Sequence, residues 1–264
     1  MTSHAILAEL RRKIGEQEKL TGHAWPVAAS GATELDAVLP SGGLATGALH
    51  EFLPAAHGDF AAMLGFGLGA LARIVSCRPG HVVWVLPAWQ QRAWGALYPA
   101  GLAPFGIDCR LFTCVRTPKT QNMLWALEEA LANGAVAAVI GILPENDRGY
   151  DFTASRRLAM RAARHGVTAF IFSSQPQFAM ATATETRWAI AAEPCRPKAY
   201  PGHAMAGLGP PRWRLQLVKS RKGNTGNWTV EWDHETLSFR LAAPLADRAP
   251  LRIAGPAARQ RAAA

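Results

Sequence analysis

Phosphate chemistry is considered first for the segment between the apolar run at 47–53 and the helical pattern at 59–77, because a phosphate-binding loop joins a strand to a helix. Such a loop needs the pattern GxxxxGK[ST], in which amides hold the phosphates, the lysine reaches the β and γ oxygens and the hydroxyl holds Mg²⁺. The chain here reads PAAHGDFA, without lysine. Asp59 would place negative charge against a phosphate and Phe60 has no hydroxyl, so repulsion opposes nucleotide binding. We therefore predict a degenerate nucleotide loop made of Pro54, His57, Gly58, Asp59 and Phe60.

Nucleotide hydrolysis needs two further acidic groups, a carboxylate that activates water and a ligand for the metal. In the RecA-like core that the segment GATELDAVLPSGGLATGALHEFL at 31–53 resembles, the first carboxylate follows the strand that matches 81–86, where this chain reads PAWQ. The second is expected at the end of the run 135–143, which closes on Gly-Ile-Leu, and Glu145 is a poor substitute for it. Because three parts are missing together, we predict no catalytic residue, no cofactor and no enzymatic activity.

Positive charge is concentrated in the second half of the chain. Residues 1–150 hold 11 basic and 12 acidic side chains (net −1), whereas 151–264 hold 17 and 7 (net +10). Basic side chains that neutralise phosphates release counterions, so nucleic acid is the first partner to consider. An alternative explanation is compositional, since 22 of the 28 basic residues are arginine and alanine is abundant, as in proteins from GC-rich genomes.

Three groups of basic residues are candidates for contact with DNA or a protein partner. The first recurs at three- and four-residue steps along one helix, the second follows the apolar strand of WRLQLVKS, and the third lies in a Gly- and Pro-rich loop with aromatic neighbours. The members are Arg156, Arg157, Arg161 and Arg164; Lys219, Arg221 and Lys222; and Arg196 and Lys198. The alternatives are the outer face of a helix, a solvated hairpin turn and a mobile connection.

Other kinds of site lack their residue patterns. Neither GxSxG nor HExxH occurs. The cysteines at 77, 109, 114 and 195 form no CxxC pair and have no histidine at ligand spacing, so we expect no metal and interpret them as reduced, mostly buried thiols. We expect the tryptophans at 84, 89, 94 and 125 to serve in packing.

The elements that must position these residues follow from hydrophobic patterning. Apolar strands are expected at 47–53, 81–86, 109–113, 135–143 and 168–173, alternating with helices at 59–77, 90–101, 120–133 and 153–165. Such alternation is typical of a parallel sheet covered by helices on both sides. After residue 175, short alternating runs at 187–192, 213–219, 227–232 and 236–241 predict antiparallel strands with one wet face. The fold class is α/β with an antiparallel C-terminal extension.

The two ends of the chain differ from this pattern. Residues 1–22 form an expected amphipathic helical arm, with Ile6, Leu10 and Ile14 on one stripe, that docks on its own core or on another chain. Residues 243–264 are expected to be a disordered basic tail, whose Leu251 and Ile253 are a second candidate for partner docking. The charge-free run 60–72 is too short for a membrane span and no secretory signal is recognisable, so we expect a cytoplasmic protein.

The segment GATELDAVLPSGGLATGALHEFL at 31–53 carries a family resemblance. It resembles the entry to a RecA-like ATPase core, where it leads into the first sheet strand and then the phosphate loop. LWALEEALANGAVAAVIGIL and WRLQLVKSRKGNTGNWTVEWD continue the resemblance, which covers about residues 30–240. It implies a RecA-like core at 23–242, in which Lys219 and Arg221 match residues that bridge to a neighbouring subunit's nucleotide.

A RecA-like chain of this length without a phosphate loop, with an arm and a basic tail, resembles the ImuA family, which is grouped with SulA-like proteins. The resemblance implies a non-catalytic accessory role in SOS-induced translesion synthesis, close to the nucleoid. The implied partners are RecA, an ImuB-like Y-family polymerase homologue and, indirectly, an error-prone DnaE-type polymerase, with single-stranded DNA and self-association through the arm as further candidates. The alternatives are a SulA-like cell-division inhibitor and an active DNA-dependent ATPase.

Overall fold

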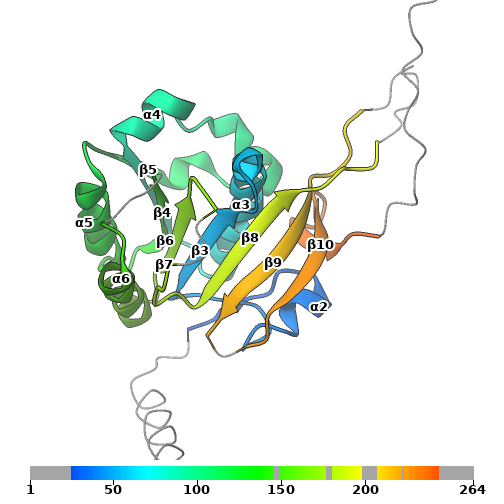
Figure 1. Cartoon of the computed structure of the whole chain (residues 1–264), viewed down its shortest axis with the longest axis horizontal. Helices are drawn as coiled ribbons and strands as arrows, with labels where there is room; N and C mark the ends of the chain where they lie inside the picture. The colour runs from blue at the N-terminus through cyan, green and yellow to red at the C-terminus, as the bar shows by residue number, and fades with distance from the viewer. Residues whose placement is uncertain (1–24, 145–148, 177–179, 198–206, 222, 244–264) are drawn as a thin grey trace, which may run out of the picture.

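The computed structural model describes residues 25–144, 149–176, 180–197, 207–221 and 223–243. The expected arm at 1–22 and all but the first residue of the expected tail at 243–264 lie outside these ranges. The described chain folds around one large twisted sheet with helices on both faces (Figure 1). The α/β class predicted from the sequence is confirmed, and the architecture is consistent with a RecA-like fold.

Nine strands form the sheet. In spatial order they are β11 (Ser238–Leu241), β10 (Gly226–Asp233), β9 (Arg212–Ser220), β8 (Thr186–Ala192), β3 (Leu49–Pro54), β7 (Thr168–Ser173), β6 (Val136–Leu143), β4 (His81–Pro87) and β5 (Phe112–Thr117). Strands β5, β4, β6, β7, β3 and β8 run parallel, and β9, β10 and β11 continue the sheet antiparallel. A two-stranded ribbon, β1 (Val27–Ala28) with β2 (Leu44–Ala45), lies outside this sheet.

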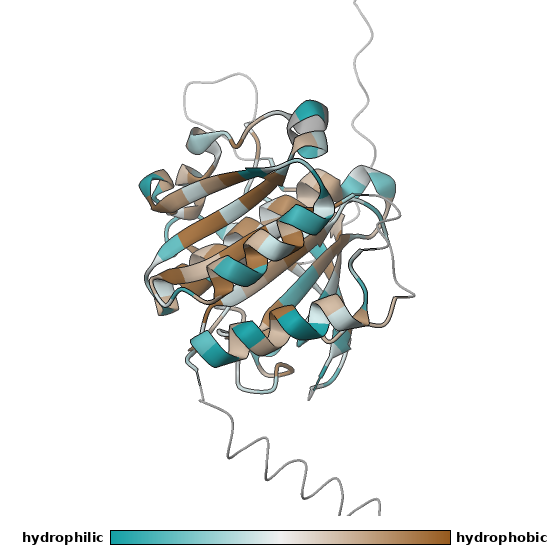
Figure 2. Ribbon diagram, turned by 90° about the vertical axis from the view of Figure 1, so that its left-hand side faces the viewer, coloured by the Kyte–Doolittle hydropathy of each residue, from teal (hydrophilic) through white to brown (hydrophobic). Residues whose placement is uncertain are grey.

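Helices on the two faces enclose two separate hydrophobic cores. Helix α3 (Phe60–Cys77) covers one face, where Phe52, Phe66 and Phe172 pack together. The other face is covered by α5 (Thr120–Leu131) and α6 (Phe152–His165). Figure 2 looks at this second side, where the helices carry bands of hydrophilic residues and the strands are mainly hydrophobic.

Shorter helices complete the described part of the chain. They are α2 (Thr33–Asp36) and α4 (Ala88–Trp94), and the 3-10 turns η1 (His57–Asp59), η2 (Pro99–Gly101), η3 (Ala103–Phe105) and η4 (Cys109–Leu111). The stretch 57–77 is apolar enough by length and composition to cross a membrane, although the charge-free run suggested otherwise. Its apolar residues have a place in the fold, because Met63, Phe66, Leu71 and Ile74 are buried against the sheet.

Local signals in the sequence explain where α6 begins and ends. The Asp151 carboxylate accepts a hydrogen bond from the Ala154 amide at 2.8 Å, which caps the first turn. At the other end Gly166 adopts a left-handed conformation with φ of 71°, which terminates the helix. The predicted helix 153–165 is therefore confirmed almost to the residue.

Several sequence predictions were wrong in detail. The helix expected at 90–101 ends at Trp94, since Gly95 turns the chain with φ of 79°. Residues 109–111 form a 3-10 turn, and the strand expected there begins at Phe112. Strand β8 was expected to be antiparallel with a wet face; it pairs antiparallel with β9 but parallel with β3, and it is buried on both faces up to Ala191.

Two side-chain predictions were also wrong. Trp125 was expected to pack in the core, but it is 65% exposed on α5. The cysteines were expected to be mostly buried, but Cys109 and Cys114 are exposed, while Cys77 and Cys195 are intermediate. All four are free thiols, in agreement with the expected absence of disulfides.

Candidate functional site: a self-capped turn and a basic groove

The turn that was predicted to be a degenerate nucleotide loop lies between β3 and α3. After Pro54 the chain makes only a short connection, Ala55–Ala56 and the 3-10 turn η1, before α3 begins at Phe60. The Asp59 carboxylate folds back over this turn: Oδ2 accepts a hydrogen bond from the Ala56 amide at 3.1 Å, and Oδ1 accepts one from the Ala192 amide at 2.9 Å. Asp59 thus joins the turn to the end of β8.

This arrangement fills the turn with the protein's own anion. A phosphate loop leaves several amides free for the phosphates, whereas here the Ala55 amide donates to Ile190 O at 2.8 Å and the Ala56 amide to Asp59. A phosphate at the turn would have to displace the carboxylate and meet its charge. Gly58 has neither a positive φ nor an atom within 4 Å of a built Cβ, so the turn does not depend on glycine there.

The neighbouring strand ends supply no replacement acids. Strand β4 passes directly into α4, and Gln90, which is 6% exposed, stands where a water-activating carboxylate was sought. Strand β6 is buried over its whole length and ends on Leu143, while Glu145 lies outside the described residues. Among the residues that the structure describes, no group of three or more His, Cys, Asp or Glu is placed to hold a metal.

A cluster of buried charged and polar side chains links β3 to β8, and its two charged members lie on these adjacent strands. Arg187 Nε donates to Glu51 Oε2 at 2.6 Å, and both side chains are 6% exposed. The Tyr150 hydroxyl donates to Glu51 Oε1 at 2.5 Å, and Arg187 Nη2 donates to Thr182 Oγ1 at 2.6 Å. Burial, together with the charge of Glu51, raises the pKa of Tyr150 well above its usual value, so this hydroxyl stays protonated and remains a donor.

Sequence reasoning missed this cluster. Glu51 was noticed only as part of the segment 31–53, and neither Tyr150 nor Arg187 was singled out. One signal was available, since Arg187 is a charged residue inside an apolar strand, and such a residue needs a buried partner. Glu51 and Arg187 are register partners on adjacent parallel strands, which the sequence cannot reveal without the strand order.

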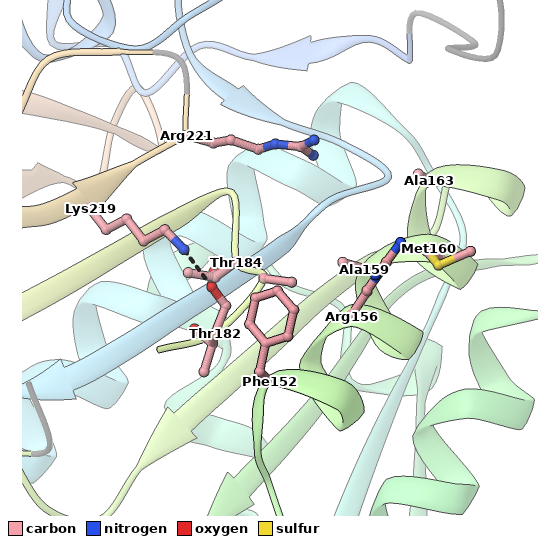
Figure 3. A pocket seen from close by; sticks show the side chains of 10 residues that line it. Phe152, Arg156, Ala159, Met160, Ala163, Thr182, Thr184, Lys219 and Arg221 are labelled. Carbon is pink, nitrogen blue, oxygen red and sulfur yellow. Dashed lines mark hydrogen bonds between the residues drawn. The ribbon is translucent and has the colours of Figure 1, made fainter. Parts of the chain in front are cut away.

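An open groove of about 620 Å³ lies at the other end of β8, where the strand begins. We call it the basic groove. It lies between one face of α6 and the ends of β8 and β9 (Figure 3) and is lined by Phe152, Arg156, Ala159, Met160, Ala163, Thr182, Ala183, Thr184, Lys219 and Arg221. Phe152 and Met160 are 51% and 62% exposed, so apolar side chains face solvent beside cations.

Lys219 and Arg221, which the sequence had singled out, are brought together on the rim of this groove. Lys219 Nζ donates to Thr182 O at 2.5 Å, and Arg221 extends from the end of β9 toward α6 (Figure 3). Partial burial lowers the pKa of Lys219, and the charges of Arg187 and Arg221 lower it further. The carboxylates of Glu51 and Glu185 act in the opposite direction on this pKa, so Lys219 lies among charges of both signs.

The four arginines expected to form one basic stripe on α6 divide into two sets. Arg157 Nε lies 3.0 Å from Glu128 Oε1, and Arg161 lies 3.8 Å from Glu128 and 3.4 Å from Glu129 across the gap to α5. Arg156 lines the basic groove and Arg164 is exposed; neither has an ion-pair partner among the described residues. Two of the four arginines thus pair with acidic residues of α5, and the assignment of the set to DNA or partner contact stays a prediction.

The other candidate residues are less informative. Arg196 is exposed in the connection after β8. Lys198 and Lys222 fall outside the described residues, as do the candidate docking residues Ile6, Leu10, Ile14, Leu251 and Ile253. Their assignment to DNA or partner contact stays a prediction.

Comparison with known proteins supplies the remaining observation. No protein-family model matches the chain. The chain is 31% identical over 236 residues to Protein ImuA of Caulobacter vibrioides strain NA1000 / CB15N, covering 84% of this chain and 91% of that protein. Protein ImuA of Caulobacter vibrioides strain ATCC 19089 / CIP 103742 / CB 15 matches with the same identity and coverage.

Proposed function

The chain belongs to the ImuA family, and from this premise we propose that it is a non-catalytic, RecA-like accessory protein of SOS-induced, error-prone translesion DNA synthesis. Family membership supports a role in the SOS mutagenesis cassette. The finer proposal is that the protein binds RecA, an ImuB-like Y-family polymerase homologue, or both, and that it reaches an error-prone DnaE-type polymerase only indirectly. It acts in the cytoplasm, at the nucleoid.

One observation carries the non-catalytic part of this proposal. The Asp59 carboxylate accepts hydrogen bonds from Ala56 and Ala192 at the turn where a nucleotide phosphate would lie. A carboxylate in that position excludes a phosphate by occupying amide donors and by repulsion. No acidic side chain stands at the ends of β4 and β6 within the described residues to activate water or hold Mg²⁺.

The partner-binding part of the proposal draws on the basic groove. Lys219 and Arg221, which by resemblance match residues that bridge neighbouring subunits in RecA-like filaments, both line this groove, and in the proposed role they face a carboxylate or a phosphate on a partner. Exposed Phe152 and Met160 beside them are typical of an interaction surface. A RecA-like scaffold that retains such a surface without nucleotide chemistry fits an adaptor.

Two assays on the full-length protein test the proposal. Phosphate release from ATP in the presence of single-stranded DNA should not exceed the level of a mock purification. Affinity capture from cells after DNA damage should recover RecA or the polymerase homologue, and Arg221→Glu should lower that recovery while Arg240→Glu, on the exposed edge strand, should not. Recovery of division proteins without polymerase components would instead favour the SulA-like alternative.

A further inference from the structure

Helix α6 presents a second apolar face that no described element covers. Its inner face, with Ala154, Leu158 and Ala162, is buried in the core. Four positions on its outer face, Phe152, Ala159, Met160 and Ala163, line the basic groove together with Arg156. From Phe152 to Ala163 this face runs for about 16 Å at a rise of 1.5 Å per residue, which is the length of a three-turn helix.

The described chain begins at one end of this groove. Trp25 Nε1 donates to Ala163 O at 2.7 Å, and its ring lies so close to Gly47 and Gly166 that a Cβ at either glycine would come within 2.7 Å of it. Ala163 also lines the groove. The first described residue, Trp25, therefore lies at the edge of the groove beside α6.

The sequence before Trp25 contains an apolar stripe of matching length. Ile6, Leu10 and Ile14 recur every four residues with Leu7 beside them, which predicts one apolar helical face of about 12 Å. Residues 15–24 separate this stripe from Trp25, and a flexible tether of that length has a root-mean-square span of about 17 Å. The apolar stripe is thus short enough to lie along this face of α6, and the tether is long enough to let it reach the groove.

We propose that residues 3–14 dock as an amphipathic helix in the basic groove of their own chain, with Ile6, Leu10 and Ile14 against Phe152, Ala159 and Met160. The tether favours the chain's own segment over a second copy, because it supplies an effective concentration of the order of millimolar. The segment's charges are mixed, so apolar contact and tether length carry the proposal.

Photo-crosslinking of the full-length protein tests the proposal. The photoreactive amino acid p-benzoylphenylalanine is incorporated in place of Leu10, on the predicted stripe, or in place of Arg12, on the opposite side of the same predicted helix. After irradiation and digestion, mass spectrometry should find the Leu10 probe attached to α6 residues near Met160, whose side chain reacts readily with benzophenones. The Arg12 probe should give no such product.

Two companion variants and a labelling control complete the experiment. Met160→Glu, at an exposed position that should not affect folding, should lower the yield from the Leu10 probe roughly tenfold by placing a charge against the stripe; circular dichroism melting verifies the fold. Arg164→Glu, outside the groove, should leave the yield unchanged. Cross-links outside the groove, an unchanged yield in Met160→Glu, or products joined to ¹⁵N-labelled chains mixed in before irradiation would overturn intramolecular docking.

Discussion

The two ends of β8 differ in how they treat negative charge. At its C-terminal end the Ala192 amide donates to Asp59, so the protein itself supplies the anion that a RecA-like ATPase would take from a nucleotide. At its N-terminal end Thr186 stands opposite Ser220 of β9, and there the groove opens with Lys219 and Arg221 on its rim. At the C-terminal end of β8 a carboxylate of the protein thus accepts the amide hydrogen bond, whereas at the N-terminal end basic side chains line an open groove.

The largest effect is expected from breaking the ion pair that joins β3 to β8 between these ends. Arg187→Leu should lower the free energy of unfolding by about 3–5 kcal/mol, because it leaves the Glu51 carboxylate buried without its charged partner. Urea unfolding followed by circular dichroism measures this loss. Arg240→Leu, which breaks an exposed pair with Glu231, should cost less than about 1 kcal/mol. Similar losses of unfolding free energy in both variants would show that the buried Arg187–Glu51 pair contributes no more to stability than the exposed pair.

Low pH should lower the free energy of unfolding through His50, which contacts Thr186 at the N-terminal end of β8. This buried side chain is held neutral between Ala45 O, at 2.8 Å from Nε2, and the Thr186 hydroxyl, at 2.7 Å from Nδ1. Burial lowers its pKa from 6.5 to about 4. As the pH falls, the unfolded chain therefore binds the proton first, and stability present above pH 6.5 is lost progressively down to about pH 4, by roughly 3 kcal/mol.

The histidine contribution is separated from the other titrating groups by comparing pH profiles. Urea midpoints of the protein and of His50→Gln are measured between pH 7.5 and 4. The variant should be less stable at pH 7.5, and its profile should be flatter between pH 6.5 and 4. Parallel profiles would exclude His50 as a source of acid sensitivity.

A smaller loss of stability is expected at the C-terminal end of β8, where Asp59 accepts the Ala192 amide. Asp59→Ala removes the acceptor of two amide hydrogen bonds and should cost about 1–2 kcal/mol in the free energy of unfolding. Gly58→Ala is the matched control, because a Cβ there meets nothing within 4 Å and φ is not positive; its stability should be unchanged within about 0.5 kcal/mol. An Asp59→Ala variant as stable as this control would mean that the carboxylate does not hold the turn.

The smallest effect distinguishes the two arginine sets of α6. If single-stranded DNA binds on this side of the molecule, Arg156→Ala with Arg164→Ala should reduce the salt slope of binding by up to about 0.7 per lost phosphate contact. Arg157→Ala with Arg161→Ala should change it less, because these side chains are paired with acidic residues of α5. Fluorescence anisotropy with a labelled oligonucleotide over a range of salt concentrations measures both slopes. Equal slopes would contradict the division into two sets.

Much of the fold could be predicted from the sequence, because it depends on local signals. Apolar runs marked β3, β4, β6 and β7 to within two residues, and Gly166 marked the end of α6. Strand β8 was misassigned because its buried polar residues imitate an alternating pattern. Arg187 is buried only because Glu51 lies next to it on β3, and that neighbour is fixed by strand order.

The candidate site shows the same division between local and long-range information. The absence of a lysine near Asp59 was visible in the chain, but the bond from the Ala192 amide, far away in the sequence, was not. The pairing of Arg157 with Glu128 likewise depends on how α5 lies against α6. The groove joins Met160 to Arg221 across three segments of chain, so no single motif could reveal it.

Titration of the full-length protein with magnesium ATP, followed by calorimetry and by amide chemical shifts, tests most directly whether the turn capped by Asp59 excludes nucleotide. We predict no binding heat above dilution, and no shift of the Ala56 or Ala192 amide at millimolar nucleotide, with or without single-stranded DNA. Saturable binding with shifts confined to those amides would mean that the Asp59 carboxylate yields to phosphate, and it would contradict a scaffold without nucleotide chemistry.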